Sequence, residues 1–451
     1  MNTKQLKQQI LSLAIRGQLV PQDPSDEPAS ELLKRIKAER ESTVEKGRKK
    51  KVTTDTSHYQ QQPPFELPKG WVWCKVEDIS QSYIGLTYSP KDVSSQGTIV
   101  LRSSNIQNGK IDLTDIVRVS KEIPSKLVVN ANDIIICARN GSKKLVGKSA
   151  IFPHIQESFT FGAFMAICKT PLFQYVHLFL LSDLFFSQLE DVTGTTTIYQ
   201  LTQNRFNSFL LPLPPLAEQK RIAQEIDRLF TLIDQLEEDK AALQQLVSQL
   251  KSKILSLAIR GQLVPQDAND EPAEVLLKRI NPEYKSRGNL HYKNLPKGWA
   301  VCKLEDILEY KQPQEYIVNS VDYDDSYNTP VLTAGKSFII GYTNETEGIF
   351  NELPVIIFDD FTTASKYVDF KFKVKSSAMK ILKPKGNVNL AYIHYFMSIT
   401  RLISDTHKRY WISEYSKLIV PLPPLAEQQR IVEQVEKLFK QLDEIQNALA
   451  I

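Results

Sequence analysis

The stretch PLPPLAEQKRIAQEIDRLF at residues 212–230 recurs with few changes as PLPPLAEQQRIVEQVEKLF at residues 421–439. Its adjacent prolines suit the first turn of a helix, and isoleucine, valine and leucine then return at steps of four and three. This spacing is the a/d pattern of a coiled coil, in which one apolar stripe packs against another helix. Both copies therefore predict a helix that buries one face against a partner helix.

Two further stretches also occur twice, in the same cyclic order. QLKQQILSLAIRGQLVPQD at residues 5–23 returns as QLKSKILSLAIRGQLVPQD at residues 249–267, and LPKGWVWCKVEDI at residues 67–79 returns as LPKGWAVCKLEDI at residues 295–307. The segments between these blocks do not match each other. The chain is therefore one unit used twice. We infer that the shared frame holds the geometry and that the dissimilar inserts carry specificity.

The apolar seam of the central helix spans about five heptads, which corresponds to roughly 50 Å at ~1.5 Å per residue. Gly261 ends this helix. The second copy of the seam is split between the two chain ends. We expect the terminal helices to meet, to complete a second long helix and to pack against the central one, closing the chain into a pseudo-twofold ring. The seam positions are Ile222, Ile226, Leu229, Ile233, Leu236, Leu243, Val247, Leu250 and Ile254 in the central helix, Ile431, Val435, Leu438, Leu442 and Ile445 near the C-terminus, and Leu6, Ile10 and Leu13 near the N-terminus.

Both inserts contain short runs of β-branched and aromatic residues followed by one apolar helical stretch, which predicts mixed α/β domains. The expected fold class is α+β, with two such domains joined by a long antiparallel coiled coil in a pseudo-twofold cyclic arrangement. The expected segments are an N-terminal helical segment (1–38), a basic polar linker (39–66), a first insert domain (67–211), a central coiled-coil region (212–280), a second linker (281–294), a second insert domain (295–420) and a C-terminal helix (421–451).

The composition excludes several classes of protein. The four cysteines form no CxxC pair and the six histidines are scattered, so we expect no metal site and a reducing compartment. The N-terminus lacks the apolar core of a signal peptide, and polar residues interrupt the most apolar stretch, residues 175–186. A cytoplasmic protein without a membrane span is therefore expected.

The net charge of +4 is small for 451 residues, so the local distribution of charge must indicate the partner. Residues 34–51 carry nine basic and three acidic side chains. This stretch is either a solvated tether or a contact to phosphate, and the sequence favours neither reading.

Loops in both inserts combine cations with hydroxyl and amide groups, which is what sequence readout of DNA requires. Cations contact phosphates, whereas hydroxyls and amides recognise the edges of bases. The candidate DNA-binding residues are Arg102, Asn105, Arg139, Asn140, Ser142, Lys143, Lys144, Lys148, Thr196, Tyr199 and Gln203 in the first insert, and Thr333, Lys336, Thr363, Lys366, Lys371, Lys408, Arg409, Tyr410 and Trp411 in the second.

Three stretches suggest catalytic motifs but depart from them. GSKKLVGKS at residues 141–149 has five residues between its glycines instead of the four of a phosphate-binding P-loop, and a strand-like run follows it. QPPF at residues 62–65 lacks the leading Asn or Asp of an amino-methyltransferase motif. The DFK of residues 369–371, with Asp359 and Asp360 upstream, suggests a nuclease metal site but has no counterpart in the first insert. No catalytic residue is therefore predicted.

The repeated blocks, PLPPLAEQ leading into a coiled coil, ILSLAIRGQLVPQD and LPKGW, resemble those of type I restriction–modification specificity subunits over the whole chain. The resemblance implies that the inserts are target-recognition domains, each reading one half of a bipartite, asymmetric DNA site. It implies that the coiled coil sets the spacer and docks two modification subunits, which bind S-adenosylmethionine and methylate adenine. Restriction subunits would add cleavage that depends on ATP and Mg, while this chain would hold no cofactor.

Two other functions are compatible with the same sequence. The chain could be a scaffold whose inserts bind proteins, in which case its affinity for DNA would be absent or independent of salt. It could instead be a self-sufficient nuclease or methyltransferase, in which case the chain alone would turn over with Mg²⁺ or S-adenosylmethionine.

Overall fold

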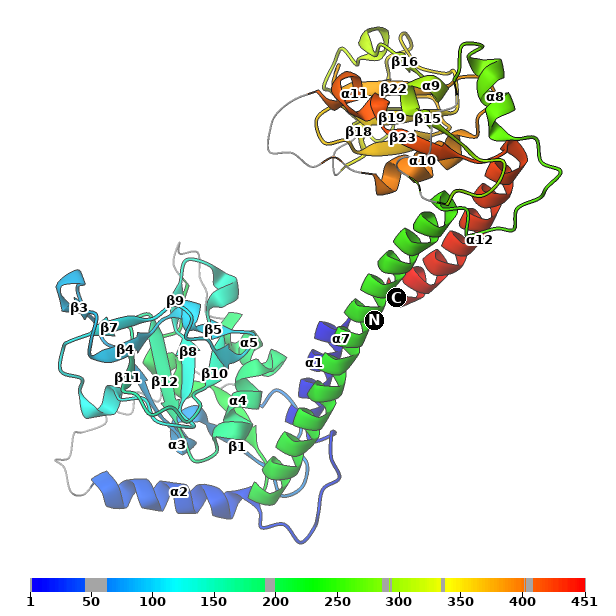
Figure 1. Ribbon diagram of the computed structural model, residues 1–451. Helices are drawn as coiled ribbons and strands as arrows, with labels where there is room; N and C mark the ends of the chain where they lie inside the picture. The colour runs from blue at the N-terminus through cyan, green and yellow to red at the C-terminus, as the bar shows by residue number, and fades with distance from the viewer. Residues whose placement is uncertain are drawn as a thin grey trace. The chain divides into compact units, whose positions relative to one another are not determined.

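The chain forms two compact units, Met1–Glu238 and Asp239–Ile451, and each contains one copy of every repeated block. The long helix α7 (Leu216–Ile259) begins in the first unit and ends in the second (Figure 1). Most of the predicted basic linker, residues 45–62, lies outside the residues that the computed structural model describes. The described residues are 2–44, 63–190, 199–285, 292, 294–333, 337–400, 402 and 409–450.

The first unit has mixed α+β content. Its helices besides α7 are α1 (Thr3–Ile15), α2 (Ala29–Val44), α3 (Val76–Ile79), α4 (Phe173–Leu181), α5 (Asp183–Glu190) and α6 (Gln203–Ser208). Its strands are β1 (Val72–Lys75), β2 (Gln81–Ile84), β3 (Val93–Ser94), β4 (Thr98–Leu101), β5 (Ile106–Gln107), β6 (Lys110–Ile111), β7 (Val117–Val119), β8 (Ile134–Cys137), β9 (Arg139–Asn140), β10 (Ser149–Ile151), β11 (Phe159–Phe161), β12 (Met165–Lys169), β13 (Tyr199–Gln200) and β14 (Leu210–Leu213).

The second unit has the same kind of content. Its further helices are α8 (Ala273–Ile280), α9 (Leu304–Ile307), α10 (Leu390–Ile399), α11 (Tyr410–Ser413) and α12 (Leu425–Ala450). Its strands are β15 (Ala300–Lys303), β16 (Leu308–Lys311), β17 (Thr329–Leu332), β18 (Ile339–Thr343), β19 (Val355–Asp359), β20 (Ser365–Val368), β21 (Lys373–Val374), β22 (Met379–Pro384) and β23 (Ile419–Leu422).

The main sheets of the two units share one topology although the inserts differ in sequence. The strand order is β10-β8-β12-β2 in the first unit and β20-β19-β22-β16 in the second, and all neighbouring strands are antiparallel. A smaller sheet accompanies each, in which β4 pairs in parallel with β11 and β17 pairs in parallel with β21. The two inserts are therefore two versions of one domain.

Alternation along the central strand divides the core of each unit in two. Ile134 and Ile136 of β8 belong to the cluster with α4 and α5, whereas Ile135 and Cys137 belong to the cluster with β4 and β11. Successive side chains of a strand point to opposite faces, which accounts for this division. Figure 1 shows α4 and α5 beside the sheet that contains β8 and β12. In the second unit, alternate residues of β19 are divided between two clusters in the same way.

The three repeated blocks meet at one buried carboxylate in each unit. Glu218 of the PLPPLAEQ block accepts a hydrogen bond from Trp71 Nε1 at 2.9 Å and another from Gln22 Nε2 at 3.1 Å. Strand β1 also pairs with β14, so that the LPKGW block lies against the PLPPL block. The three blocks are repeated together because each supplies one part of the same junction. The second unit repeats the junction with Glu427, Trp299 and Gln266.

Each terminal helix packs against the part of α7 that lies in its own unit. In the first unit, α1 and α7 share a core cluster and Lys7 forms an ion pair with Asp234. In the second unit, α12 and α7 share a core cluster and Lys251 forms an ion pair with Asp443 at 2.5 Å. These contacts agree with the predicted pairing of terminal and central helices. The meeting of the two terminal helices stays a prediction.

Most predicted seam residues are covered, but a few are not. Leu13 is 41% exposed, because α1 also contacts α4 and α5 and buries Leu11 and Ile15. Its place in the seam or in a docking surface stays a prediction. The exposed seam residues are Leu236, Leu243, Leu250 and Ile445, at 39–45%. The buried or half-buried ones are Leu6, Ile10, Ile222, Ile226, Leu229, Ile233, Val247, Ile254, Ile431, Val435, Leu438 and Leu442.

Candidate nucleic-acid interface

Three loops that the sequence singles out in the first unit lie together. The loop after β8 and the segment before α6 are joined because β9 pairs with β13 and the amide of Leu201 donates to the carbonyl of Ala138 over 2.7 Å. The loop after β4 is tied to the same group, since Lys148 Nζ donates to the carbonyl of Ser103 over 3.2 Å. Segments about one hundred residues apart thus form one loop cluster in the first unit.

The corresponding loops of the second unit also lie together. The loop after β19 meets the segment at α11, because the amides of Tyr410 and Trp411 donate to the carbonyl and the side chain of Asp360 at 2.9 Å and 2.8 Å. Asp360 also lies 3.4 Å from Lys380, and both side chains are buried. This aspartate therefore holds the loops together, and the described residues show no group of acidic side chains able to hold a metal ion.

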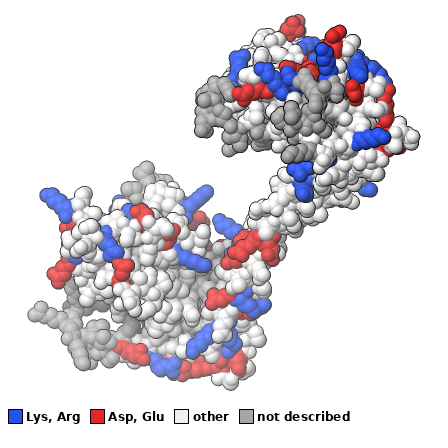
Figure 2. Space-filling view, viewed as in Figure 1, with Lys and Arg blue, Asp and Glu red and all other residues white. Residues whose placement is uncertain are grey.

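Several candidate residues present polar atoms at these loops. The exposed ones are Ser142, Lys143 and Lys144 in the first unit and Lys366, Lys371 and Arg409 in the second. The half-buried ones are Arg102, Arg139, Asn140, Lys148, Tyr199 and Thr333. Figure 2 shows basic side chains interspersed with acidic ones on the visible faces of both units. Thr196, Lys336 and Lys408 lie outside the described residues.

Two amide side chains of the first unit hydrogen-bond to the backbone of the loops. Asn105 is 2% exposed; its Oδ1 accepts from the amide of Arg102 at 2.9 Å, and its Nδ2 donates to the carbonyls of Asp112 and Asp115. Gln203 donates to the carbonyl of Ser82 at 2.6 Å. Amides bond backbone and bases equally well, so the sequence could not separate the two uses. The prediction that Asn105 contacts DNA is therefore wrong.

Three candidate DNA-binding residues of the second unit are also buried. Thr363 is 1% exposed and occupies the left-handed region at φ 55°, while Tyr410 and Trp411 are 1% and 4% exposed. The ring of Trp411 packs against Phe358 at 5.4 Å between centroids. These side chains pack beneath the surface of the loops and are not accessible to a ligand. Their placement in the DNA contact set is corrected accordingly.

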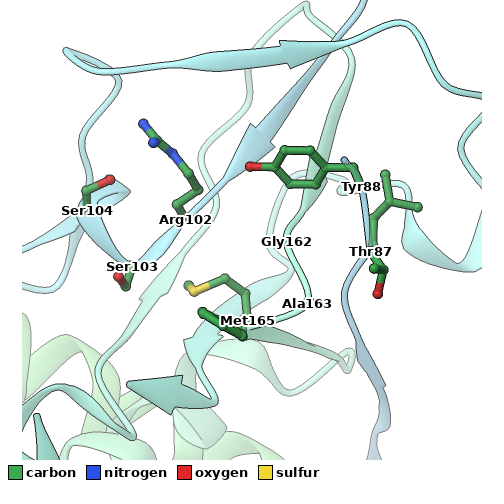
Figure 3. Close-up of a pocket in the computed structure, with 10 residues that line it drawn as sticks. Thr87, Tyr88, Arg102, Ser103, Ser104, Gly162, Ala163 and Met165 are labelled. Carbon is green, nitrogen blue, oxygen red and sulfur yellow. The ribbon is translucent and has the colours of Figure 1, made fainter. Parts of the chain in front are cut away.

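The sequence reading missed an exposed aromatic residue at the first loop cluster. Phe164 is 60% exposed, its carbonyl accepts from the amides of Ala138 and Arg139, and the Arg139 guanidinium lies 5.3 Å from the centre of its ring. A cavity of about 480 Å³ opens beside it, between Tyr88 and Arg102 (Figure 3). The only signal in the sequence was a phenylalanine directly after Gly-Ala between two buried strands.

The cysteine side chains are shielded from solvent. All four cysteines are buried free thiols, and burial raises the pKa of Cys168 to about 12, so its nucleophilic thiolate is disfavoured. The P-loop-like stretch leads into strand β10 and not into a helix, as the sequence predicted. Among the described helices, none is both long enough and apolar enough to cross a membrane.

The fold defines a class of proteins in which a repeated helical frame accompanies two domains of common topology and unlike sequence. A family model described as "Type I restriction modification DNA specificity domain" matches residues 68–245 and 296–450. The chain therefore belongs to this family, and its role is DNA sequence specificity in a type I restriction–modification system. The resemblance stated from the sequence is confirmed.

Individual relatives agree with this assignment. The Escherichia coli type I restriction enzyme EcoR124I/EcoR124II specificity subunit is 51% identical over 126 residues, which cover 27% of this chain and 31% of that subunit. The Escherichia coli EcoAI specificity subunit is 26% identical over 97% of this chain and 89% of its own length. The crystal structure of the HsdS subunit from Thermoanaerobacter tengcongensis matches 85% of this chain and 93% of its own, with a TM-score of 0.52 and 18% identity, and this likeness concerns the fold.

Proposed function

We propose that each loop cluster reads one half of a bipartite, asymmetric DNA site. The observation that carries this proposal is that the two inserts share one topology and the same loops, while the side chains on corresponding loops differ. After the central strand the first unit has Arg139 and Asn140, whereas the second has Phe361 and Thr362. Two domains with the same fold but different side chains on their loops would recognise different half-sites. The recognition domains would span residues 67–211 and 295–420.

The contact residues proposed for DNA are those whose polar atoms are accessible at the two clusters. The lysines and arginines would neutralise phosphates, and the hydroxyl and amide groups would reach base edges in a groove. The proposed set is Arg102, Arg139, Asn140, Ser142, Lys143, Lys144, Lys148, Tyr199, Thr333, Lys366, Lys371 and Arg409.

The helical frame would act as the ruler that sets the spacer between the half-sites. Helix α7 contains 44 residues, which corresponds to about 66 Å at ~1.5 Å per residue. One turn of DNA is about 34 Å, so a helix of this length reaches adjacent or next-adjacent turns of a groove. The pairing of α1 and α12 with α7 in their own units supports an antiparallel, pseudo-twofold frame in which the terminal helices complete the second strand of the coiled coil.

The exposed leucines of the frame are the proposed docking surface for two modification subunits. Leu236, Leu243 and Leu250 are 39–45% exposed on a helix whose other seam positions are covered. Exposed leucines at heptad spacing suit packing against a partner helix. S-adenosylmethionine would belong to the modification subunits, and ATP and Mg²⁺ to restriction subunits. The chain itself would be non-catalytic, and the buried free thiols support a cytoplasmic location.

Fluorescence anisotropy with random duplex DNA tests the proposal. The full chain, alone and with its methyltransferase partner, is titrated at several salt concentrations. We expect affinity that falls steeply as salt rises, because phosphate contacts release counterions. Affinity without salt dependence, or no affinity even with the partner present, would favour a protein-binding scaffold instead.

A turnover assay tests the non-catalytic assignment. S-adenosylmethionine or Mg²⁺ is added with DNA to the purified chain alone, and methyl transfer and strand cleavage are followed. No turnover is expected from the chain alone, and methylation should appear only when the modification subunit is added. Turnover by the chain alone would contradict the assignment.

A further inference from the structure

Each loop cluster exposes one phenylalanine beside the same end of the same strand pair. Phe164 is 60% exposed in the first unit, and Phe361 is 48% exposed in the second. The antiparallel pair is β8 with β12 in the first unit and β19 with β22 in the second. Phe164 directly precedes Met165, the first residue of β12, and Phe361 is the second residue after Asp359, the last residue of β19. Both phenylalanines therefore lie just beyond the end of the pair at which the polar loops gather.

The two phenylalanines reach this place from opposite strands. The amide of Ala138 donates to the carbonyl of Phe164 at 2.9 Å, and the amide of Asp360 donates to the carbonyl of Ala378 at 3.1 Å. Phe164 therefore corresponds to Ala378, on the strand of the pair opposite to the one that leads to Phe361. One exposed phenylalanine on a surface needs no explanation. Two that reach the same place by different routes, in domains of unlike sequence, indicate a shared use.

The backbone beneath each ring is held by hydrogen bonds. Asp359 Oδ1 accepts from the amides of Phe361 at 2.8 Å and Thr362 at 3.3 Å, and the amide of Thr363 donates to the Asp359 carbonyl at 3.0 Å. Thr363 occupies the left-handed region at φ 55°, which a β-branched residue adopts only where its surroundings impose it. The carbonyl of Phe164 accepts from two amides that follow β8. The rings are therefore displayed by fixed loops and do not need a ligand to bring them to the surface.

Another exposed aromatic residue of the second unit lies elsewhere. Phe370 is 37% exposed and is the second residue after β20. Strand β20 runs antiparallel to β19, and its last residue, Val368, lies opposite Val355, the first residue of β19. Phe370 therefore lies toward the opposite end of the sheet from Phe361, and its ring packs against Phe338 at 6.5 Å between centroids. It has no part in the inference.

The groups beside the rings select among possible partners. The Arg139 guanidinium lies 5.3 Å from the centre of the Phe164 ring, and the exposed Arg409 precedes Tyr410, whose amide donates to the carbonyl of Asp360. An apolar protein surface would cover the rings but would also desolvate these cations. The major groove of DNA offers phosphates nearby and one apolar group on its base edges, the 5-methyl group of thymine. A phenyl ring can satisfy none of the donors and acceptors there, so this methyl group is the match.

We propose that Phe164 and Phe361 each contact the 5-methyl group of one thymine in the half-site read by their own unit, while that thymine stays paired. The inference rests on the proposed function, because it requires both loop clusters to face the major groove. Cytosine carries no methyl group at this position and would place the ring against a polar edge. Burial of one methyl group corresponds to about a fourfold change in affinity.

The test removes each thymine methyl group in turn. The target is first identified by methylation-aware sequencing, and duplexes with a single thymine of either strand replaced by deoxyuridine, which keeps the base pair, are titrated with the full chain in complex with its methyltransferase partner. We expect about fourfold weaker binding at one thymine of each half-site. Phe164→Ala should abolish this preference in the half-site of the first unit alone, and Phe361→Ala in the other half-site alone. Leucine at either position should retain it, because the apolar contact remains.

The controls keep the outcomes separate. Leu145→Ala and Ile412→Ala remove apolar side chains at the two clusters that are 36% and 69% exposed, and both variants should retain the preference for thymine. Specific binding without any thymine that is sensitive to deoxyuridine, or a preference that survives the alanine variants of both phenylalanines, overturns the inference alone. Loss of the preference in a control variant overturns the assignment to the phenylalanine of that unit. Failure of the wild-type complex to bind any specific site overturns the proposed function together with it.

Discussion

Replacing Glu218 by alanine removes the acceptor at which the three repeated blocks of the first unit meet. Glu218 is 1% exposed, and it accepts from the buried Trp71 Nε1 and from Gln22. The indole donor would be left unsatisfied, at about 1–3 kcal/mol, whereas the exposed Gln22 amide would turn to water and lose about 0.5–1.5 kcal/mol. We therefore expect Glu218→Ala to lower the stability of the first unit by about 2–4 kcal/mol.

Hydrogen exchange followed by mass spectrometry resolves this effect by segment. A loss of about 2–4 kcal/mol corresponds to roughly 30- to 700-fold faster exchange of amides that open with the junction. The change should appear around Gln22, Trp71 and Glu218 and should leave the junction at Glu427 unaffected. Glu427→Ala is the matched control, with the reverse pattern. Acceleration below threefold in the first unit, or equal acceleration in both units, would refute the view that each carboxylate holds its own junction.

Three further predictions concern pH and salt. Burial lowers the pKa of His177 to about 4, so the neutral imidazole stabilises the fold fully above about pH 6.5, and this stability is lost as the pH falls toward 4. In urea unfolding, the wild type should lose about 2 kcal/mol of unfolding free energy between pH 7 and pH 5 relative to His177→Leu. The same pH dependence in both proteins would contradict this. Burial raises the pKa of Glu427, so ionisation of its carboxyl group disfavours folding. The unfolding free energy of Glu427→Gln should therefore rise relative to that of the wild type as the pH increases from 4 to 8. A difference in unfolding free energy that stays constant with pH would be inconsistent with a buried charge. Replacing Lys143 and Lys144 together by alanine should reduce the slope of log affinity against log salt concentration by about 2, because two phosphate contacts are lost. The control variant Lys91→Ala should leave the slope unchanged. An unaltered slope in the double variant would show that neither Lys143 nor Lys144 contacts a phosphate.

The repeated frame could be predicted from the sequence because its signals are local and periodic. The paired prolines and the four–three spacing predict a helix after residue 215, and α7 begins at Leu216. The runs TIVL, IIIC and VIIFD form strands because β-branched residues pack on both faces of a buried sheet. The fold class followed from the same signals.

The common topology of the two inserts could not be predicted. Strand order depends on pairing between distant segments, and the inserts share a strand order without sharing residues. The junction at Glu218 was missed for a related reason. A glutamate in the first turn of a helix usually faces solvent near the positive end of the helix dipole, and only the tertiary contact with Trp71 shows that this one is buried.

The sequence identified the loops but could not assign a role to each of their side chains. The sequence singled out several short loops because each combined cations with amides or hydroxyls, and the structure brings the described parts of these loops to one place in each unit. It could not separate Asn105, which bonds backbone, from Asn140, which remains half-buried at the surface. Phe164 was overlooked because a single exposed aromatic residue carries no periodic signal.

The most direct measurement is the target of a chain whose first recognition domain has been replaced. Residues 67–211 are exchanged for a second copy of residues 295–420, and methylation-aware sequencing is performed on cells that carry this chain with its modification subunit. Two identical readers on a pseudo-twofold frame should produce a symmetric target composed of the second half-site and its inverted copy. Retention of the original asymmetric target would contradict the claim that each domain reads its own half-site.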